Sequence, residues 1–98
     1  MVDWVVKVHP DFLRDLDRLD NAILQIFRKK KEKIKMNPLR LKHLSGGENC
    51  YREEITRNIR LIYYIKSNVI WFLTIGPHDK AYEDYIKRLH NLRQTLIK

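Results

Sequence analysis

The 98-residue sequence predicts an α+β fold, in which a strand and two helices precede a mainly antiparallel four-strand meander and a C-terminal helix. Two changes in hydrophobic spacing carry this prediction. Apolar residues recur every three or four positions before Pro38 and every two positions after it, and helical spacing returns after Gly76-Pro77. Because the length suits one common domain and no linker or repeat interrupts it, we expect residues 1–98 to share one core.

The N-terminal part predicts one strand and two helices. Residues 3–8 are rich in β-branched and aromatic side chains, which favour a strand. Pro10 suits the first position of a helix, and Asp20 can cap a second helix that should end at Asn37, before Pro38. The first helix has an expected apolar stripe of Phe12, Leu13, Leu16 and Leu19 and an expected solvent face of Asp11, Arg14, Asp15 and Asp17. The second has a stripe of Ile23, Ile26, Phe27 and Ile34, extended by the stem of Lys30.

The C-terminal part predicts a meander of strands followed by a long helix. The expected strands are residues 40–44, 51–56, 59–66 and 69–75, separated by Gly46-Gly47, Arg57-Asn58 and Ser67-Asn68. The last two strands are apolar on both faces and should be central in the sheet. From Asp79 a helix carries the stripe Tyr82, Tyr85, Ile86, Leu89, Leu92 and Leu96, which we expect to pack on its own domain with Tyr82 beside His78.

Composition narrows the class of function. The formal charge of +8 and the isoelectric point near 9.8 favour polyanionic partners, with nucleic acid first among them. Small basic proteins also bind polyanions without a dedicated site. No apolar stretch approaches the ~20 residues that span a bilayer, and the N-terminus lacks the features of a secretion signal. The single cysteine, Cys50, agrees with a reducing compartment, so we expect a cytoplasmic protein.

Two segments carry a resemblance to a known family. They are CYREEITRNIRLIYYI, residues 50–65, and WFLTIGPHDKAYEDYIKRL, residues 71–89. Their ordered motifs run from the Tyr51-Arg52 strand start, through Arg60-Leu61-Ile62-Tyr63, to a tyrosine that opens the last helix. This set resembles the RelE/ParE superfamily of toxins, and more closely its ribosome-dependent RNA-cleaving branch. The resemblance covers almost the whole chain and implies a single RelE-like toxin domain.

The resemblance also implies a function. It is that of the toxin in a type II toxin–antitoxin system, an endoribonuclease that cleaves mRNA on the ribosome without a cofactor and so inhibits translation. A RelB-like antitoxin would hold the toxin inactive in a hetero-oligomer. Two alternatives stay open, a ParE-like gyrase poison and an inactive module that binds RNA or only its antitoxin.

Arg60 is the first candidate site residue. Metal-independent RNA cleavage needs a proton acceptor, a proton donor and cations near the phosphoryl oxygens. Arg60 lies in an otherwise apolar strand, and its guanidinium suits a phosphate. The resemblance implies that it stabilises the transferring phosphate; alternatively, it pairs with Glu53 or Glu54 at the wet end of the strand.

Arg52 and Glu54 form the second candidate feature. The resemblance aligns Arg52 with a basic residue used near the nucleophile and the phosphate. Glu54 departs from the family, whose best-known members carry a second lysine there. Since the two share one face of the strand, Glu54 is either a general base or an ion-pair partner, and the ion pair is favoured.

His78 and Tyr82 complete the predicted catalytic set. His78 follows the end of the last strand, and histidine can exchange protons near neutral pH without a large shift in its pKa. The alternative is a histidine at the start of the helix with Asp79 as the cap. Tyr82 matches a tyrosine that contacts the cleaved nucleotide in family toxins, but it also fits the apolar stripe and could serve packing alone.

The second helix is unusually basic, which is typical of a solvated face or of a surface that contacts ribosomal RNA phosphates. The candidate RNA- and ribosome-binding residues are Lys29, Lys30, Lys31, Lys33 and Lys35, with Arg28 beside them and Lys42 and His43 extending the surface. A metal site is not expected, since His9, His43, His78 and His90 have no ligand spacing and Cys50 is alone.

Overall fold

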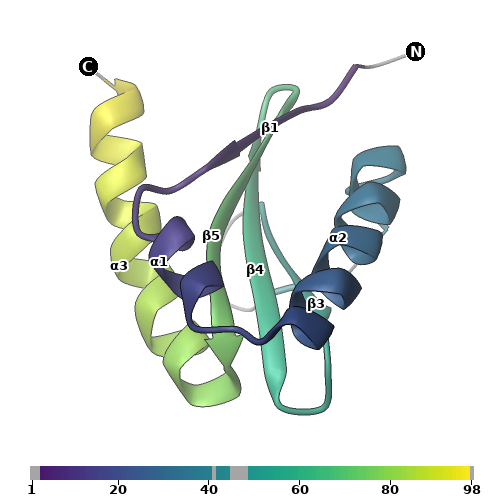
Figure 1. Cartoon of the computed structure of the whole chain (residues 1–98). Helices are drawn as coiled ribbons and strands as arrows, with labels where there is room; N and C mark the ends of the chain where they lie inside the picture. The colour runs from purple at the N-terminus through teal and green to yellow at the C-terminus, as the bar shows by residue number, and fades with distance from the viewer. Residues whose placement is uncertain (1–2, 41, 45–48, 98) are drawn as a thin grey trace.

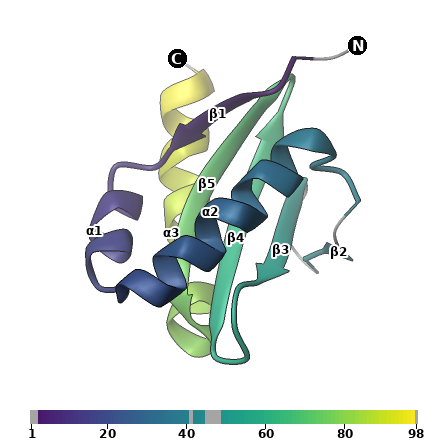
Figure 2. The same ribbon diagram turned by 45° about the vertical axis from the view of Figure 1, so that its right-hand side comes forward.

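The computed structural model describes residues 3–40, 42–44 and 49–97, which form five strands and three helices around one sheet (Figure 1). Helices α1 (Phe12–Asp17) and α2 (Asn21–Met36) cover one face of the sheet, and α3 (His78–Ile97) covers the other (Figure 2). This arrangement confirms the expected α+β fold. The predicted Gly46-Gly47 turn lies outside the described residues.

The first three elements are β1 (Val5–Val8), α1 (Phe12–Asp17) and α2 (Asn21–Met36). The predicted ends of α2 are confirmed, because the Asp20 carboxylate accepts a hydrogen bond from the Ile23 amide at 2.9 Å and Asn37 is the C-cap. The expected start of α1 at Pro10 is wrong. The Asp11 amide donates to Nδ1 of His9, and the resulting turn delays the helix to Phe12.

The expected faces of α1 also need correction. The side chain of Asp15 was expected in solvent, yet the residue is only 4% exposed, whereas Leu13 is 56% exposed. The pattern failed because α1 has six residues, too few for periodicity to define a face. Burial of the Asp15 carboxylate is possible because Arg88 of α3 pairs with it.

The sheet has the order β1-β5-β4-β3-β2. The remaining strands are β2 (Lys42–His43), β3 (Cys50–Glu54), β4 (Ile59–Lys66) and β5 (Val69–Pro77). All neighbours pair antiparallel except β1, which is parallel to β5. The central position predicted for the two apolar strands, now β4 and β5, is confirmed.

Helix α3 (His78–Ile97) begins one residue before the predicted Asp79. Its predicted stripe is confirmed where Tyr85, Leu89 and Leu92 are buried against the sheet. Ile86 departs from the prediction, because it is 58% exposed. The face of α3 that contacts the sheet is narrower than the predicted apolar stripe, so Ile86 lies beside this face and not in it. The side chain of Leu96 is not among those described.

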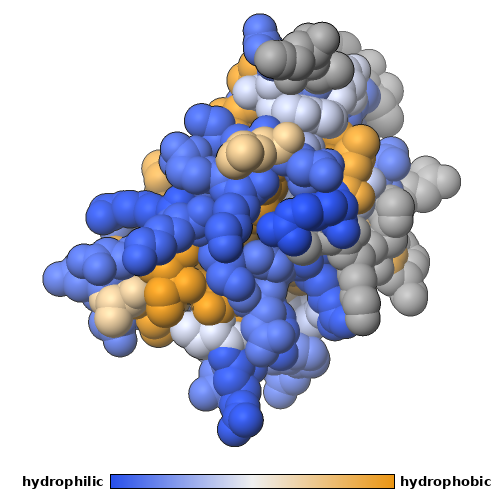
Figure 3. Space-filling view, turned by 90° about the vertical axis from the view of Figure 1, so that its right-hand side faces the viewer, coloured by the Kyte–Doolittle hydropathy of each residue, from blue (hydrophilic) through white to orange (hydrophobic). Residues whose placement is uncertain are grey.

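Helix α2 presents a mostly hydrophilic surface, with smaller apolar patches around it (Figure 3). No helix in the described part of the chain combines the length and apolar character that crossing a membrane requires. Within the same residues, no group of histidine, cysteine and acidic side chains could hold a metal ion.

Candidate active site at the start of helix α3

Strand register places three of the predicted residues on the α3 side of the sheet. Arg52 is opposite Ile62, whose side chain packs in the core beneath α3. Glu54 is opposite Arg60, and both lie two residues from that pair. Because opposite residues and alternate residues share a face, Arg52, Glu54 and Arg60 all face the layer that contains α3.

Tyr82, in the first turns of α3, contacts two of the other predicted site residues, Arg52 and His78. Nη1 of Arg52 donates a hydrogen bond to the Tyr82 hydroxyl at 2.9 Å. The Tyr82 ring lies 4.5 Å from the His78 ring, centroid to centroid, and packs edge-on against Tyr85. Tyr82 therefore packs with its ring and presents its hydroxyl at the same time, beside His78 as expected.

His78 is the first residue of α3, and its side chain is half exposed. Its backbone amide donates to the carbonyl of Asn58 at 3.1 Å, which ties the start of α3 to the turn between β3 and β4. Its Nδ1 lies 3.2 Å from the Asp79 carboxylate. Since this contact uses Nδ1, the other ring nitrogen is left to meet a ligand.

Arg60 turns back toward the loop between β3 and β4. Its Nη1 donates to the carbonyls of Thr56 at 2.9 Å and Arg57 at 2.8 Å, and lies 3.8 Å from Glu54. The contacts that Arg60 makes with described side chains and carbonyls all use Nη1. The rest of the guanidinium fork remains for an anion.

Glu54 forms an ion pair with Arg60, which confirms the alternative given for Arg60, whereas the favoured pair of Glu54 with Arg52 is wrong. The reason is distance. A residue directly opposite on the next strand is closer than a residue two positions along the same strand. The Glu54 side chain is 62% exposed, so solvent screens this pair.

Open space lies next to Arg60. Gly76 of β5 is the register partner of Arg60, and a Cβ at Gly76 would meet no other atom within 4 Å. The glycine thus leaves open space on β5, at the register position opposite Arg60. The sequence analysis interpreted Gly76 only as the end of the last strand, so it did not predict that Gly76 lies opposite Arg60.

The basic residues of α2 lie on the opposite side of the sheet from this cluster (Figure 2). Lys30 pairs with Glu53 at 3.4 Å and Lys35 pairs with Glu32 at 3.6 Å, while Lys29 and Lys33 are exposed. The structure therefore does not bring the lysine run and the predicted catalytic residues together. The side chains of Lys42 and His43 lie outside those described.

Two buried groups bear on the chemistry of the protein. Burial raises the pKa of the Cys50 thiol to about 11, so this cysteine is not a thiolate nucleophile at neutral pH. The sequence also missed the buried pair of Asp15 and Arg88. A possible signal was an arginine placed next to the apolar stripe of α3, but its partner is too distant in sequence for any local pattern.

Comparisons with known proteins agree with this architecture. Residues 6–82 match the family model described as the ParE toxin of the type II toxin–antitoxin system, parDE. A mutant of the Escherichia coli toxin RelE in the free state is 19% identical, with 90% of this chain and 98% of that chain covered and a TM-score of 0.77. RelE in the archaeal RelE–RelB complex from Pyrococcus horikoshii is 23% identical, with coverages of 81% and 99% and a TM-score of 0.66.

A third structure, the intact RelBE toxin–antitoxin complex of E. coli, is 18% identical, with 76% of this chain and 95% of that chain covered and a TM-score of 0.70. At such identities these structures establish the fold alone. No curated protein sequence matches the chain.

Proposed function

The chain belongs to the ParE toxin family of type II toxin–antitoxin systems, and we propose that it acts as an endoribonuclease that cleaves mRNA on the ribosome. The family membership makes it a toxin of the RelE/ParE superfamily. The proposal of RNA cleavage rests chiefly on one observation, an Arg60 guanidinium on the α3 side of the sheet whose contacts with described residues all use Nη1.

In the proposed reaction, the ribose 2′-hydroxyl attacks the adjacent phosphorus and the bond to the 5′-oxygen breaks. A base removes the proton of the 2′-hydroxyl, and an acid delivers a proton to the departing oxygen. Arg60 stabilises the negative charge that develops on the phosphoryl oxygens, because its guanidinium fork matches their geometry. Glu54 orients Arg60 through their ion pair.

His78 and Tyr82 serve the nucleotide in this proposal. His78 exchanges protons with the reacting oxygens, since its half-exposed ring reaches solvent next to Tyr82. Tyr82 offers its ring to the base of the cleaved nucleotide, and Arg52 fixes the direction of its hydroxyl. All five predicted residues thus act from one side of the sheet.

Partners follow from charge and from the relatives. RelE proteins that share this fold crystallise with RelB antitoxins. We propose that an acidic or amphipathic antitoxin segment binds this chain, whose formal charge of +8 attracts such a segment in a manner weakened by salt. The lysine run of α2 contacts ribosomal RNA phosphates from the other side of the sheet, and the site of action is the cytoplasm, where ribosomes are.

The proposal is tested by adding the protein to a translation extract programmed with a defined mRNA and mapping cuts by primer extension. We expect cuts within codons held on the ribosome. Arg60→Ala should lower the cleavage rate by about 10²–10³, the typical loss when one donor to developing charge is removed. Arg57→Ala is the matched control, since it removes an equal charge from an exposed side chain in the adjacent turn and keeps the backbone carbonyl that Arg60 contacts.

A second candidate function is favoured by the family model, which is that of ParE toxins. If the extract shows intact mRNA while purified gyrase accumulates trapped DNA breaks, the chain is a gyrase poison and the nuclease assignment is wrong. Neither effect would indicate an inactive module that binds RNA or its antitoxin. Wild-type cutting by Arg60→Ala would remove Arg60 from the site.

A further inference from the structure

Strand β5 is paired with β1 along only about half of one edge. β1 pairs with β5 from Val69 to Phe72 and then ends, while β5 continues to Pro77. Beyond Phe72, two side chains take the place of the missing strand. The Asp15 carboxylate accepts a hydrogen bond from the Ile75 amide at 3.2 Å, and Nη1 of Arg88 donates to the Leu73 carbonyl at 2.8 Å. Both backbone groups would otherwise be buried without partners, which is costly.

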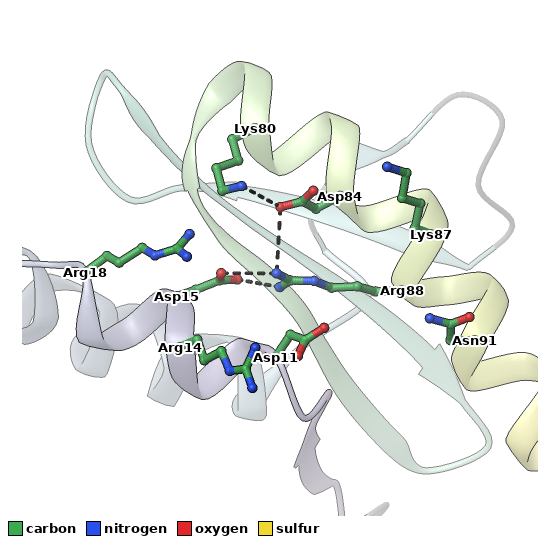
Figure 4. A pocket seen from close by; sticks show the side chains of 9 residues that line it. All are labelled: Asp11, Arg14, Asp15, Arg18, Lys80, Asp84, Lys87, Arg88 and Asn91. Carbon is green, nitrogen blue, oxygen red and sulfur yellow. Dashed lines mark hydrogen bonds and ion pairs between the residues drawn. The ribbon is translucent and has the colours of Figure 1, made fainter.

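The same two side chains bind each other. Nη1 of Arg88 contacts Oδ2 of Asp15, and Nη2 of Arg88 donates to Oδ1 at 3.2 Å, so the pair is bidentate. The Arg88 side chain is 11% exposed and the Asp15 side chain is 4% exposed. Figure 4 shows them meeting directly, from α1 and α3, and both line a pocket of about 330 Å³. Burial alone would lower the pKa of Arg88, but the hydrogen bond and charge of Asp15 outweigh burial and raise it, so the guanidinium keeps its charge.

A short chain of charges extends the pair along α3. Asp84 lies 3.7 Å from Arg88, and Lys80 lies 3.4 Å from Asp84. Lys80 and Asp84 flank Tyr82 in sequence. Arg88 follows Tyr82 by six residues, which corresponds to about 9 Å along a helix. The pair therefore holds α3 within two turns of the residue that meets Arg52.

The pair differs from the apolar contacts of α3 in being directional. Ala81, Tyr85 and Leu89 press the helix onto the sheet, but apolar contact alone permits small slides and rotations. The fork of Arg88 has fixed angles to Asp15 and to Leu73, and Asp15 is itself fixed by the Ile75 amide. These bonds define where α3 sits along β5.

We propose that Asp15 and Arg88 are positioning residues, which hold helix α3 against the open edge of β5 so that the Tyr82 hydroxyl meets Arg52. Their effect on cleavage rests on the nuclease function proposed above. Their effect on the position of Tyr82 does not. The two consequences can be measured separately.

The test uses the double variant Asp15→Leu/Arg88→Met, because removing one partner alone strands a buried charge and can unfold the protein, whereas an apolar pair of similar size is often tolerated. The variant should still fold, as cooperative unfolding in urea would show. Its kcat for mRNA cleavage should fall at least several-fold, as for Tyr82→Phe, with KM little changed, because both changes break the contact between Tyr82 and Arg52. Lys80→Ala is the control, since it removes an exposed cation of the same pocket and should keep wild-type kcat. The single variant Arg88→Lys, which keeps Asp15 and a positive charge, should lose less kcat than the double variant.

A readout independent of activity is fluorine NMR of protein labelled with 3-fluorotyrosine, with the Tyr82 resonance assigned by Tyr82→Phe. The Tyr82 resonance should move in the double variant and stay in place in Lys80→Ala. Addition of Tyr82→Phe to the double variant should cost little further activity, since both changes disturb one contact.

The inference is overturned if the folded double variant keeps the wild-type Tyr82 resonance, or if its losses and those of Tyr82→Phe multiply. If the resonance moves but wild-type protein cuts no mRNA, Asp15 and Arg88 still position Tyr82 and the nuclease function is what fails.

Discussion

The two faces of the sheet are built differently. Under α1 and α2 the core is aromatic, with Phe12, Phe27 and Phe72 in mutual ring contact at 5.6–5.9 Å. On the same face Tyr51 and Tyr63 stack at 5.4 Å. Under α3 the core is smaller and it gives way, toward the start of that helix, to half-buried and charged side chains. The first face is packed mainly with apolar and aromatic side chains, whereas the second ends in polar and charged side chains at the start of α3.

Two tyrosines show what this difference means. The Tyr63 hydroxyl is buried and donates to the carbonyl of Pro38 at 2.8 Å, so it is fully committed to the fold. The Tyr82 hydroxyl accepts from Arg52 at the edge of the protein, within reach of solvent. We infer that one face supplies most of the stability, while the other holds chemical groups whose partners can change.

The largest expected effect is on the α1 and α2 face. Phe72→Ala should lower the free energy of unfolding by about 3–5 kcal/mol, because it removes a ring that touches Phe12, Phe27 and Tyr63 and leaves a cavity. Urea unfolding followed by circular dichroism measures this loss. Phe72→Leu is the milder comparison, expected to cost less than Phe72→Ala since it fills more of the space. A loss below about 1 kcal/mol for Phe72→Ala would mean that this face is not the main source of stability.

A smaller effect separates the two tyrosines. Tyr82→Phe should reduce mRNA cleavage at least several-fold with little change in melting temperature, because the hydroxyl lies at the edge of the fold. Tyr63→Phe should do the opposite, costing about 1 kcal/mol of stability through its lost hydrogen bond and leaving the cleavage rate unchanged. Equal cleavage by wild type and Tyr82→Phe would assign Tyr82 to packing alone.

The smallest expected effect is a pH dependence at the start of α1. Burial lowers the pKa of His9 from its ordinary 6.5, and its Nδ1 accepts a hydrogen bond from the Asp11 amide only when unprotonated. The unfolded chain therefore binds the proton more readily, so stability contributed by His9 is complete above pH 6.5 and decreases as the pH falls through the lowered value. The change should be about 1 kcal/mol or less.

His9→Asn provides the matched control for this pH dependence. An asparagine side chain can accept the same amide hydrogen from two residues along the chain and does not titrate. Melting temperatures between pH 5 and 8 should therefore fall less steeply at low pH for His9→Asn than for wild type. Parallel curves would show that His9 does not contribute to the acid sensitivity.

Local patterns in the sequence determined most of the secondary structure of this protein. The spacing of apolar residues predicted the order of helices and strands, because each period follows from the geometry of one element. Asp20 and Pro38 set the ends of α2 through bonds and clashes within a few residues. The apolar character of β4 and β5 placed them at the centre of the sheet. The resemblance led to Arg52 and Tyr82, which the structure joins by a hydrogen bond.

Tertiary structure decided which groups meet. Glu54 pairs with Arg60 because of strand register, and the α2 lysines lie away from the site because α2 packs on the other face. Asp15 looked like a solvent residue of a short helix, yet it is buried by an arginine 73 positions away, at a strand edge that exists only because β1 ends early. A sequence pattern reports the face of one element, whereas the partner of a charge depends on how distant elements pack.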